Sequence, residues 1–266
     1  MAQIELSRTY FSRQPVNDLE TLIRHYGKAQ FESPRRSTVP LLSLIRDGQA
    51  TLQAVLSKCG FSVAPDLHFE FTVDPPLGRG KASHTDLMVL AEANCMAVEA
   101  KWTEPPYPTV SDWMKPLGTG EERNRRSENR RKVFAGWLEL LQPFATRTLT
   151  TEDVASVTYQ TVHRAASACA TAARPQLSYL QFVSEHYGDA DVCDERMADL
   201  RRLRDALGRP DGFPFRLIEI DIKSTPEFER LAMLPKGSAQ TAIAMRHALI
   251  FRTLFTFEAI RMHLLP

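Results

Sequence analysis

The sequence lacks the cysteine patterns that mark disulfide frameworks and zinc sites. Its 266 residues include only four cysteines, at scattered positions without paired spacing: Cys59, Cys95, Cys169 and Cys193. Disulfide scaffolds and structural zinc sites need dense or regularly spaced cysteines. We therefore expect these four residues to be reduced members of the core.

Long hydrophobic runs are also missing. No apolar segment follows Met1, and no run of membrane-spanning length is free of charged residues. We therefore expect no membrane partner and a cytoplasmic location.

The chain has no large excess of charge of either sign. Its 33 lysines and arginines nearly balance 32 aspartates and glutamates, for a net charge of +1. This balance argues against a protein that coats nucleic acid through its overall charge. Basic residues do gather locally, in residues 35–36, 123–132 and 201–209, so a local basic groove stays open as an interpretation.

Common enzyme motifs are absent too. The sequence shows no Gly-Lys-Ser/Thr phosphate loop, no nucleotide-binding glycine fingerprint and no Ser/His/Asp nucleophile motif. The main signal of chemistry is instead a set of charges within an apolar segment.

That segment, residues 84–105, has the pattern of a buried β-hairpin. Two runs rich in Val, Leu and Met, residues 85–91 and 95–102, flank the turn residues 92–94. Both runs are apolar on both faces, which is typical of strands in the middle of a sheet.

Three charges interrupt the hairpin. Asp86 lies near the start of the first run, and Glu99 and Lys101 lie on one face near the end of the second, so the fold-back brings all three toward one end of the sheet. Burying these charges is costly unless they pair or hold a metal ion. Two carboxylates that leave coordination positions free for water and phosphate suit Mg²⁺.

At these residues the sequence resembles the PD-(D/E)XK restriction-endonuclease-like nucleases. That family has an acidic residue, a spacer through a strand pair, and then Asp or Glu, any residue and Lys, which Asp86, Glu99 and Lys101 match. Thr85 stands where the family name has Pro. The resemblance covers residues 47–184 and implies an α/β, three-layer fold with a central mixed sheet, an αβββαβ core flanked by helices, and terminal embellishments.

The resemblance implies a metal-dependent nuclease that hydrolyses phosphodiester bonds, with DNA as the expected substrate and partner. Asp86, Glu99 and the carbonyl of Ala100 would hold Mg²⁺ or Mn²⁺, and Lys101 would orient or help to deprotonate the attacking water. The alternative is a non-catalytic protein of the same fold that binds nucleic acid or serves assembly, with the charges as a buried ion network. Binding of a divalent metal separates the two hypotheses.

A second short motif competes for the assignment. Asp221-Ile222-Lys223, preceded by Pro210-Asp211, also has an acidic residue two positions before a lysine. Such a tripeptide is expected about twice by chance in a chain of this length, so the order of elements must decide. A helical region and another apolar strand follow Lys101, whereas no clear helix-then-strand unit follows Lys223. We therefore place the site at the hairpin and interpret residues 217–223 as a half-exposed edge strand.

Four further residues are secondary site candidates. Gln160 and Arg164 lie one turn apart on a helix predicted over residues 152–173, Glu70 lies on a strand predicted over 67–73, and Glu104 follows the hairpin. An exposed structural role is the competing interpretation for Gln160, Arg164 and Glu70. Five basic residues are predicted to contact nucleic acid, two in a glycine-rich loop before Asp86 and three on the charged start of a helix: Arg79, Lys81, Arg123, Arg126 and Arg130.

We expect one nuclease-like domain. It would span residues 46–266, with a core over 47–184 and a C-terminal extension over 185–266, and residues 1–45 would be a peripheral N-terminal segment. A helix is predicted over 42–58, ending at Gly60. The sequence leaves open whether the protein forms a homodimer.

Overall fold

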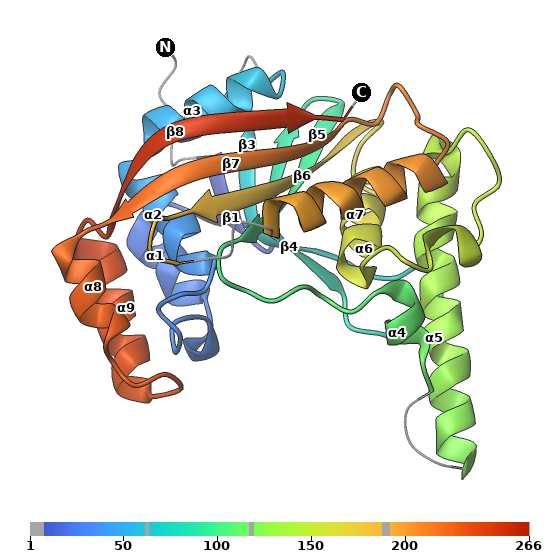
Figure 1. Cartoon of the computed structure of the whole chain (residues 1–266), viewed down its shortest axis with the longest axis horizontal. Helices are drawn as coiled ribbons and strands as arrows, with labels where there is room; N and C mark the ends of the chain where they lie inside the picture. The colour runs from blue at the N-terminus through green and yellow to red at the C-terminus, as the bar shows by residue number, and fades with distance from the viewer. Residues whose placement is uncertain (1–7, 62–63, 117–119, 188–191, 266) are drawn as a thin grey trace.

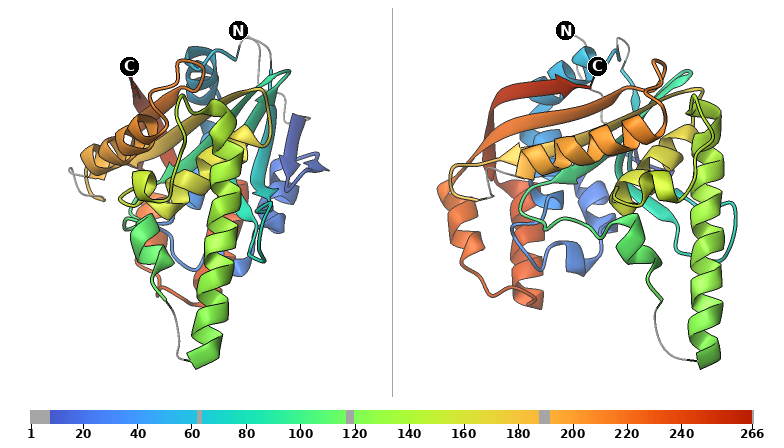
Figure 2. Two further views of the ribbon diagram at one scale, coloured as in Figure 1. Left: turned by 90° about the vertical axis from the view of Figure 1, so that its right-hand side faces the viewer. Right: turned by 45° about the vertical axis from the view of Figure 1, so that its right-hand side comes forward.

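The computed structural model of the protein describes residues 8–61, 64–116, 120–187 and 192–265. These residues form one mixed eight-stranded sheet with helices on both faces (Figures 1 and 2). The predicted α/β class with a central mixed sheet flanked by helices is confirmed. Among the described helices, none is long and apolar enough to cross a membrane.

The strands follow the order β2-β1-β3-β4-β5-β6-β7-β8 across the sheet. Their bounds are β1 Thr9–Phe11, β2 Gln14–Val16, β3 Asp66–Val73, β4 Ser83–Ala91, β5 Asn94–Lys101, β6 Arg174–Val183, β7 Phe215–Ser224 and β8 Phe255–Leu264. β3, β4 and β5 form an antiparallel meander, whereas β5, β6 and β7 are parallel neighbours. The start of β4 and the carboxyl end of β5 therefore lie at the same edge of the sheet, the one formed by the carboxyl ends of the parallel strands.

Two helical layers cover the sheet. The layer on one face comprises α1 Leu19–His25, α2 Thr38–Asp47, α3 Gln49–Lys58, α8 Pro226–Ala232 and α9 Ala239–Phe251. The layer on the other face comprises α4 Val110–Met114, α5 Gly120–Leu141, α6 Tyr159–Cys169 and α7 Val192–Ala206. Short 3₁₀ helices occur at Lys28–Gln30, Gln142–Phe144 and Glu152–Val154.

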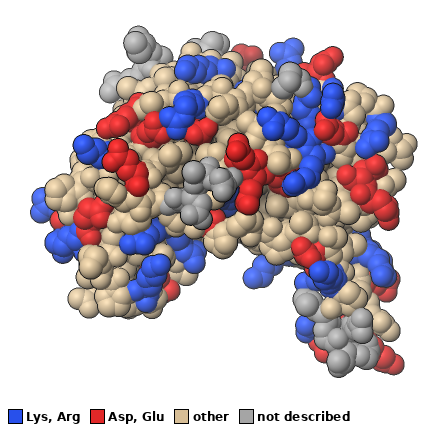
Figure 3. All heavy atoms as spheres, viewed as in Figure 1, with Lys and Arg blue, Asp and Glu red and all other residues tan. Residues whose placement is uncertain are grey.

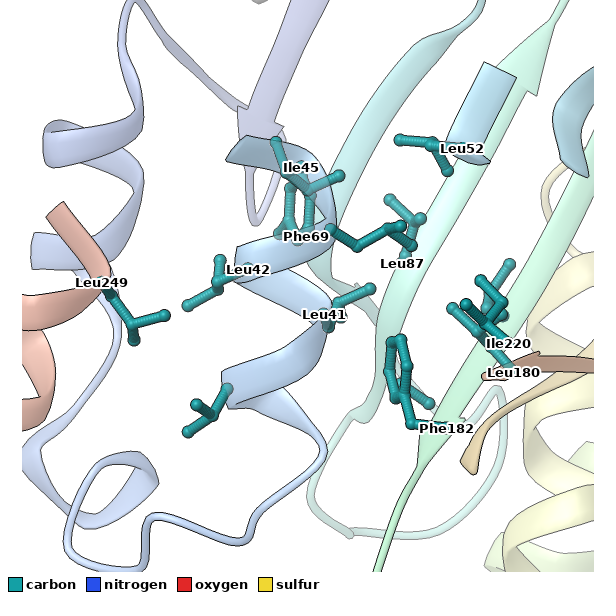
Figure 4. Close-up of a cluster of buried hydrophobic side chains, with 14 of the residues drawn as sticks. Leu41, Leu42, Ile45, Leu52, Phe69, Leu87, Leu180, Phe182, Ile220 and Leu249 are labelled. Atoms are coloured by element: carbon teal, nitrogen blue, oxygen red, sulfur yellow. The ribbon is translucent and has the colours of Figure 1, made fainter. Parts of the chain in front are cut away.

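The first layer packs through aliphatic side chains of α2. Figure 4 shows Leu41 and Ile45 of α2 directed toward strand residues that include Phe69 and Leu87, and Leu42 directed toward Leu249 of α9. All six side chains are almost completely buried. Because alternate strand residues face the same side of a sheet, one apolar set on each strand is enough to build this layer.

The second layer depends on small residues of α6. Ala165, Ala166 and Ala168 are fully buried, and the helix packs across β4, β5 and β6. The absence of bulky side chains allows a close approach of helix and sheet, which places the first turns of α6 over the ends of these strands. The helix predicted over residues 152–173 is wrong in its extent, because Thr158 caps α6 by accepting a hydrogen bond from the backbone of Thr161.

The N-terminal segment is built into the sheet and is not peripheral. β1 pairs in parallel with β3, and Leu22 and Ile23 of α1 are fully buried in the core. The prediction of one helix over residues 42–58 is wrong, because the segment forms two helices, α2 and α3, that meet at Gly48. Its predicted terminator, Gly60, does have the expected positive φ of 87°.

The prediction of an edge strand at residues 217–223 is wrong. β7 lies between β6 and β8, and most of its residues are buried. A helix-then-strand unit does follow Lys223, namely α8 and α9 and then β8. The apolar segment 244–262 is divided between α9 and β8, and β8 takes the edge position.

Candidate active site

Three carboxylates lie in one row across three neighbouring strands. The register of β4 and β5 pairs Leu87 with Val98, and its continuation sets Asp86 opposite Glu99. The register of β3 and β4 likewise sets Glu70 opposite Asp86. Glu70, the secondary candidate on β3, thus lies in the same row as the predicted Asp86 and Glu99.

Glu70 occupies an unusual backbone conformation for a strand. Its φ is 48°, in the left-handed region that residues with a Cβ rarely adopt. Phe69 faces the layer of α2 while Phe71 faces the layer of α5 and α6, so β3 changes face at this residue. Burial raises the pKa of Glu70 to about 7, with Arg164 opposing and Glu99 adding to the shift. The left-handed backbone coincides with a carboxyl group held near the other two.

Glu99 is 3% exposed and fully paired. Its Oε1 accepts hydrogen bonds from Lys101 Nζ at 2.8 Å and Gln160 Nε2 at 2.6 Å, and its Oε2 accepts one from Arg164 Nε at 2.5 Å. Burial alone would raise the pKa of Glu99, but Arg164 and Lys101 lower it to about 2. Gln160 and Arg164 of α6 therefore lie against the hairpin, and Glu99 remains ionised.

Lys101 is held on two sides. Its Nζ donates to Glu99 Oε1 and, at 2.7 Å, to Gln160 Oε1. Burial opposes the charged form, but the carboxylates of Glu99 and Asp86 outweigh it and raise the pKa of Lys101. The side chain is thus a fixed ammonium group.

Asp86 has a different environment. Its Oδ2 accepts a hydrogen bond from the backbone N–H of Ala100 at 2.8 Å, and among the described residues it forms no ion pair. Burial and then the Glu99 carboxylate raise the pKa of Asp86 well above its usual range. Ala100 was predicted to contribute its carbonyl to a metal site, which stays a prediction. Its side chain packs in the core on the opposite face from Glu99.

The donor set is suited to a hard divalent cation. No group of three or more His, Cys, Asp or Glu side chains arranged to hold a metal occurs in the described ranges. Mg²⁺, however, commonly uses one or two protein carboxylates and completes its shell with water and phosphate. Burial is the main cause of the raised pKa values of Asp86 and Glu70, and the Glu99 carboxylate adds to the negative charge that both would carry when ionised. A divalent cation would offset that charge.

Two residues beside the row had no clear signal in the sequence. Arg164 Nη1 donates to Ser83 Oγ at 2.8 Å, and this hydroxyl lies 2.8 Å from His163 Nδ1. Burial lowers the pKa of His163 well below its usual value, so the ring is neutral. Ser83 stands at the start of β4, where only the strand register could have placed it near α6.

A pocket of about 470 Å³ opens beside Arg164. Three of the predicted nucleic-acid contacts line it: Arg79, Lys81 and Arg130. The loop that carries the first two is fixed to α5, because Asn129 exchanges two hydrogen bonds with the backbone of Arg79. Gly78 is required there, since a Cβ would lie 2.9 Å from the backbone nitrogen of Val133.

The outer half of α5 carries both signs of charge. This half extends beyond the sheet (Figure 2), and Figure 3 shows lysine or arginine beside aspartate or glutamate at its tip. Arg126 pairs with Glu122 one turn earlier. The side chain of Arg123 lies outside the described part of the chain. Arg130 donates to the carbonyl oxygens of Trp113 and Lys115, so it ties α5 to α4 as well as facing the pocket.

Glu104 lies outside the carboxylate row. Its two oxygens accept hydrogen bonds from the backbone N–H groups of Ser37, at 2.5 Å, and Trp102, at 2.9 Å. Ser37 precedes α2, so Glu104 joins the start of that helix to the end of β5. The contacts of this secondary candidate are structural.

The second sequence motif does not form a comparable cluster. Asp221 and Glu219 both pair with Arg261 on β8, and Lys223 is exposed.

We expect Asp221→Asn and Lys223→Ala to leave any cleavage rate unchanged and to reduce the free energy of unfolding by less than about 1 kcal/mol. Denaturant titration and a cleavage assay would check this. Loss of activity in these variants, with activity kept in Glu99→Gln, would show that the site is on β7.

A family model described as "Domain of unknown function (DUF6946)" matches residues 15–218. No curated protein and no solved structure matches the chain. The family match covers the carboxylate row, α6 and most of the sheet, and extends over more than half of the sequence. The chain therefore belongs to the DUF6946 family.

Proposed function

We propose that the protein is a Mg²⁺- or Mn²⁺-dependent nuclease that hydrolyses phosphodiester bonds in nucleic acid, with DNA as its substrate. The observation that carries the proposal is the convergence of Asp86, Glu99 and Lys101 at one edge of the sheet, beside a pocket lined by basic residues. A phosphodiester is an anion, and its hydrolysis needs the elements that this edge provides: metal ligands, a fixed positive charge and a basic approach.

The order of elements supports the finer fold that we propose, a restriction-endonuclease-like core. α3, β3, β4, β5, α6 and β6 occur in the order αβββαβ, with α4 and α5 inserted between β5 and α6. The first three strands are an antiparallel meander, and β5 and β6 are parallel. The parallel step requires a crossover, which here includes α5 and α6 and brings Gln160 and Arg164 to the site.

Asp86 and Glu99 would hold the metal ion, together with the Ala100 carbonyl that the family resemblance implies. When bound, the ion would polarise the phosphate and lower the pKa of the attacking water. Lys101 keeps its proton, because Glu99 and Asp86 raise its pKa. Its role is then to donate hydrogen bonds and to offset negative charge in the transition state. Gln160 fixes the direction of the ammonium group through the 2.7 Å hydrogen bond.

A non-catalytic module of the same fold is the second candidate. The observation that favours it is the complete pairing of Glu99, whose oxygens accept from Lys101, Gln160 and Arg164. A closed network of this kind is also what a structural ion cluster needs. In this alternative the pocket beside α5 would bind nucleic acid without cleavage.

The two candidates differ in their response to divalent metal. We expect the purified protein to nick or cut plasmid DNA with Mg²⁺ or Mn²⁺, to lose this activity in excess chelator and to regain it when metal is restored. Gel analysis of plasmid, linear DNA and RNA substrates would measure it.

The double variant Asp86→Asn, Glu99→Gln is the control for a contaminating nuclease, because it removes the carboxylate ligands. Cleavage that persists in excess chelator, or in this variant, would contradict the proposal. Specific binding of nucleic acid without cleavage and without a thermal shift on Mn²⁺ addition would favour the non-catalytic module.

A further inference from the structure

A second pocket, of about 320 Å³, lies on the other side of Lys101. Lys101, Gln160, Tyr179, Arg196 and Asp199 are among its lining residues, and Tyr107 and Gln160 line both this pocket and the one beside Arg164. The two pockets therefore adjoin the same Lys101–Gln160 pair. None of the sequence motifs pointed to the α7 side of the site.

Arg196 of α7 is a buried cation without an anionic partner. It is 8% exposed, and it forms no ion pair with the described residues. Its Nε has no hydrogen-bond partner there, and its Nη2 has one long contact, 3.5 Å from the Glu104 carbonyl oxygen. The guanidinium carbon lies 5.8 Å from the centre of the Tyr179 ring. Burial lowers the pKa of Arg196, as expected for a cation that lacks compensation.

Two of the acidic side chains near Arg196 have other partners. Asp199 accepts hydrogen bonds from the backbone and hydroxyl of Thr158, both at 2.8 Å, and from the hydroxyl of Thr161. Glu104 binds the backbone of Ser37 and Trp102. These two acids hold helix ends and strand ends in place. Glu195 also lines the pocket, but it is exposed and forms no ion pair with Arg196, so the guanidinium group keeps unused donors.

An unpaired buried guanidinium is costly, and a phosphate group is the ligand that its planar fork of donors matches best. We infer that the pocket binds a phosphate group of the substrate, held by Arg196 on the α7 side of Lys101. That this phosphate belongs to a nucleic-acid strand rests on the proposed function. Bound there, it would fix the position of the strand relative to Asp86 and Glu99.

Two sources of phosphate share this chemistry: a terminal phosphomonoester and an internal phosphodiester. We would measure the affinity of short single-stranded oligonucleotides with and without a 5′-phosphate, in excess chelator so that no cleavage occurs. The variant is Arg196→Met, which keeps side-chain volume without charge, and the control is Arg201→Met, on the exposed side of the same helix and outside the pocket lining.

We expect Arg196→Met to weaken oligonucleotide binding about tenfold or more, and Arg201→Met to change it by no more than about twofold. The melting temperature of Arg196→Met should equal or exceed that of the original protein, because an uncompensated buried charge is removed. A loss confined to the 5′-phosphorylated strand assigns the pocket to a terminal phosphate. An equal loss for both strands assigns it to an internal phosphodiester.

The inference is overturned if Arg196→Met binds both strands as the original protein does. It is also overturned if the variant melts well below the original while the preference for phosphate is kept, since Arg196 is then structural. Failure of the nuclease proposal would look different: binding that depends on Arg196 would persist, and no cleavage would follow the addition of Mg²⁺ or Mn²⁺.

Discussion

Replacing Lys101 by methionine is expected to lower the single-turnover rate of cleavage by about 10² to 10⁴-fold. The ammonium group is held 2.8 Å from Glu99 Oε1 and 2.7 Å from Gln160 Oε1, so it is placed before substrate arrives. Methionine keeps the volume but removes the charge that offsets the transition state. Metal affinity should stay the same or rise, because a cation next to the carboxylates repels the ion.

Measurement of Mn²⁺ affinity by calorimetry, beside single-turnover cleavage, separates these two effects. Lys58→Met is a matched control, because Lys58 is an exposed lysine at the end of α3, on the opposite helical layer. The control should alter neither quantity. If Lys101→Met loses metal binding as completely as rate, Lys101 supports the structure of the site and not the chemical step.

The two carboxylates of the hairpin should respond to neutralisation in opposite ways. In excess chelator, Glu99→Gln is expected to reduce the free energy of unfolding by about 3–5 kcal/mol, because Lys101 and Arg164 are left buried without their shared anion. Asp86→Asn, by contrast, should raise the melting temperature, since burial and the Glu99 charge already disfavour its ionised form. Both substitutions replace a carboxylate by an amide of the same shape.

The same difference gives the dependence on pH. The pKa of Glu99 is lowered to about 2, so its contribution to stability is present above its unfolded pKa of about 4.3 and is lost as the pH falls toward 2. The pKa of Asp86 is raised, so its ionisation costs stability at neutral pH and this cost disappears in acid. Thermal melts of both variants between pH 3 and 8 would check the signs. A Glu99→Gln protein that melts at or above the original at pH 7 would contradict the pairing.

The central hairpin could be read from the sequence because two local patterns agreed. The apolar runs around residues 92–94 predicted two strands, and the turn residues predicted their antiparallel pairing. A pairing of this kind determines which residues meet across the strands. The convergence of Asp86 with Glu99 therefore follows from the hairpin alone, and the structure places both at the predicted edge.

The sequence predicted less well those elements that form through contacts between distant parts of the chain. β8 forms against β7 at the end of the chain, and its apolar residues merge in sequence with those of α9, so no local signal marks where the helix ends. β1 and β2 are only three residues each, and they form through pairing of β1 with β3 and of β2 with β1. The alternation of polar and apolar residues on β7 suggested a solvent-exposed face. The acidic residues of that face instead pair with Arg261 of β8.

The partners of Glu99 were predictable only as candidates. The spacing of Gln160 and Arg164 showed that they share a helix face, but which face meets the sheet depends on the small residues of α6. Arg196 gave no signal at all, because an arginine in a charged helix is ordinarily solvent-exposed. Its burial is visible only in three dimensions.

At position 70, thermal stability and the acidic side chain favour different residues. A left-handed conformation costs a residue with a Cβ about 1–3 kcal/mol, and glycine would remove most of that cost. Replacement of this residue would also remove a carboxyl group that burial and Glu99 make unfavourable to ionise. A search for variants with higher melting temperatures would therefore select substitutions at this position early. Each such substitution would remove one carboxylate from the row.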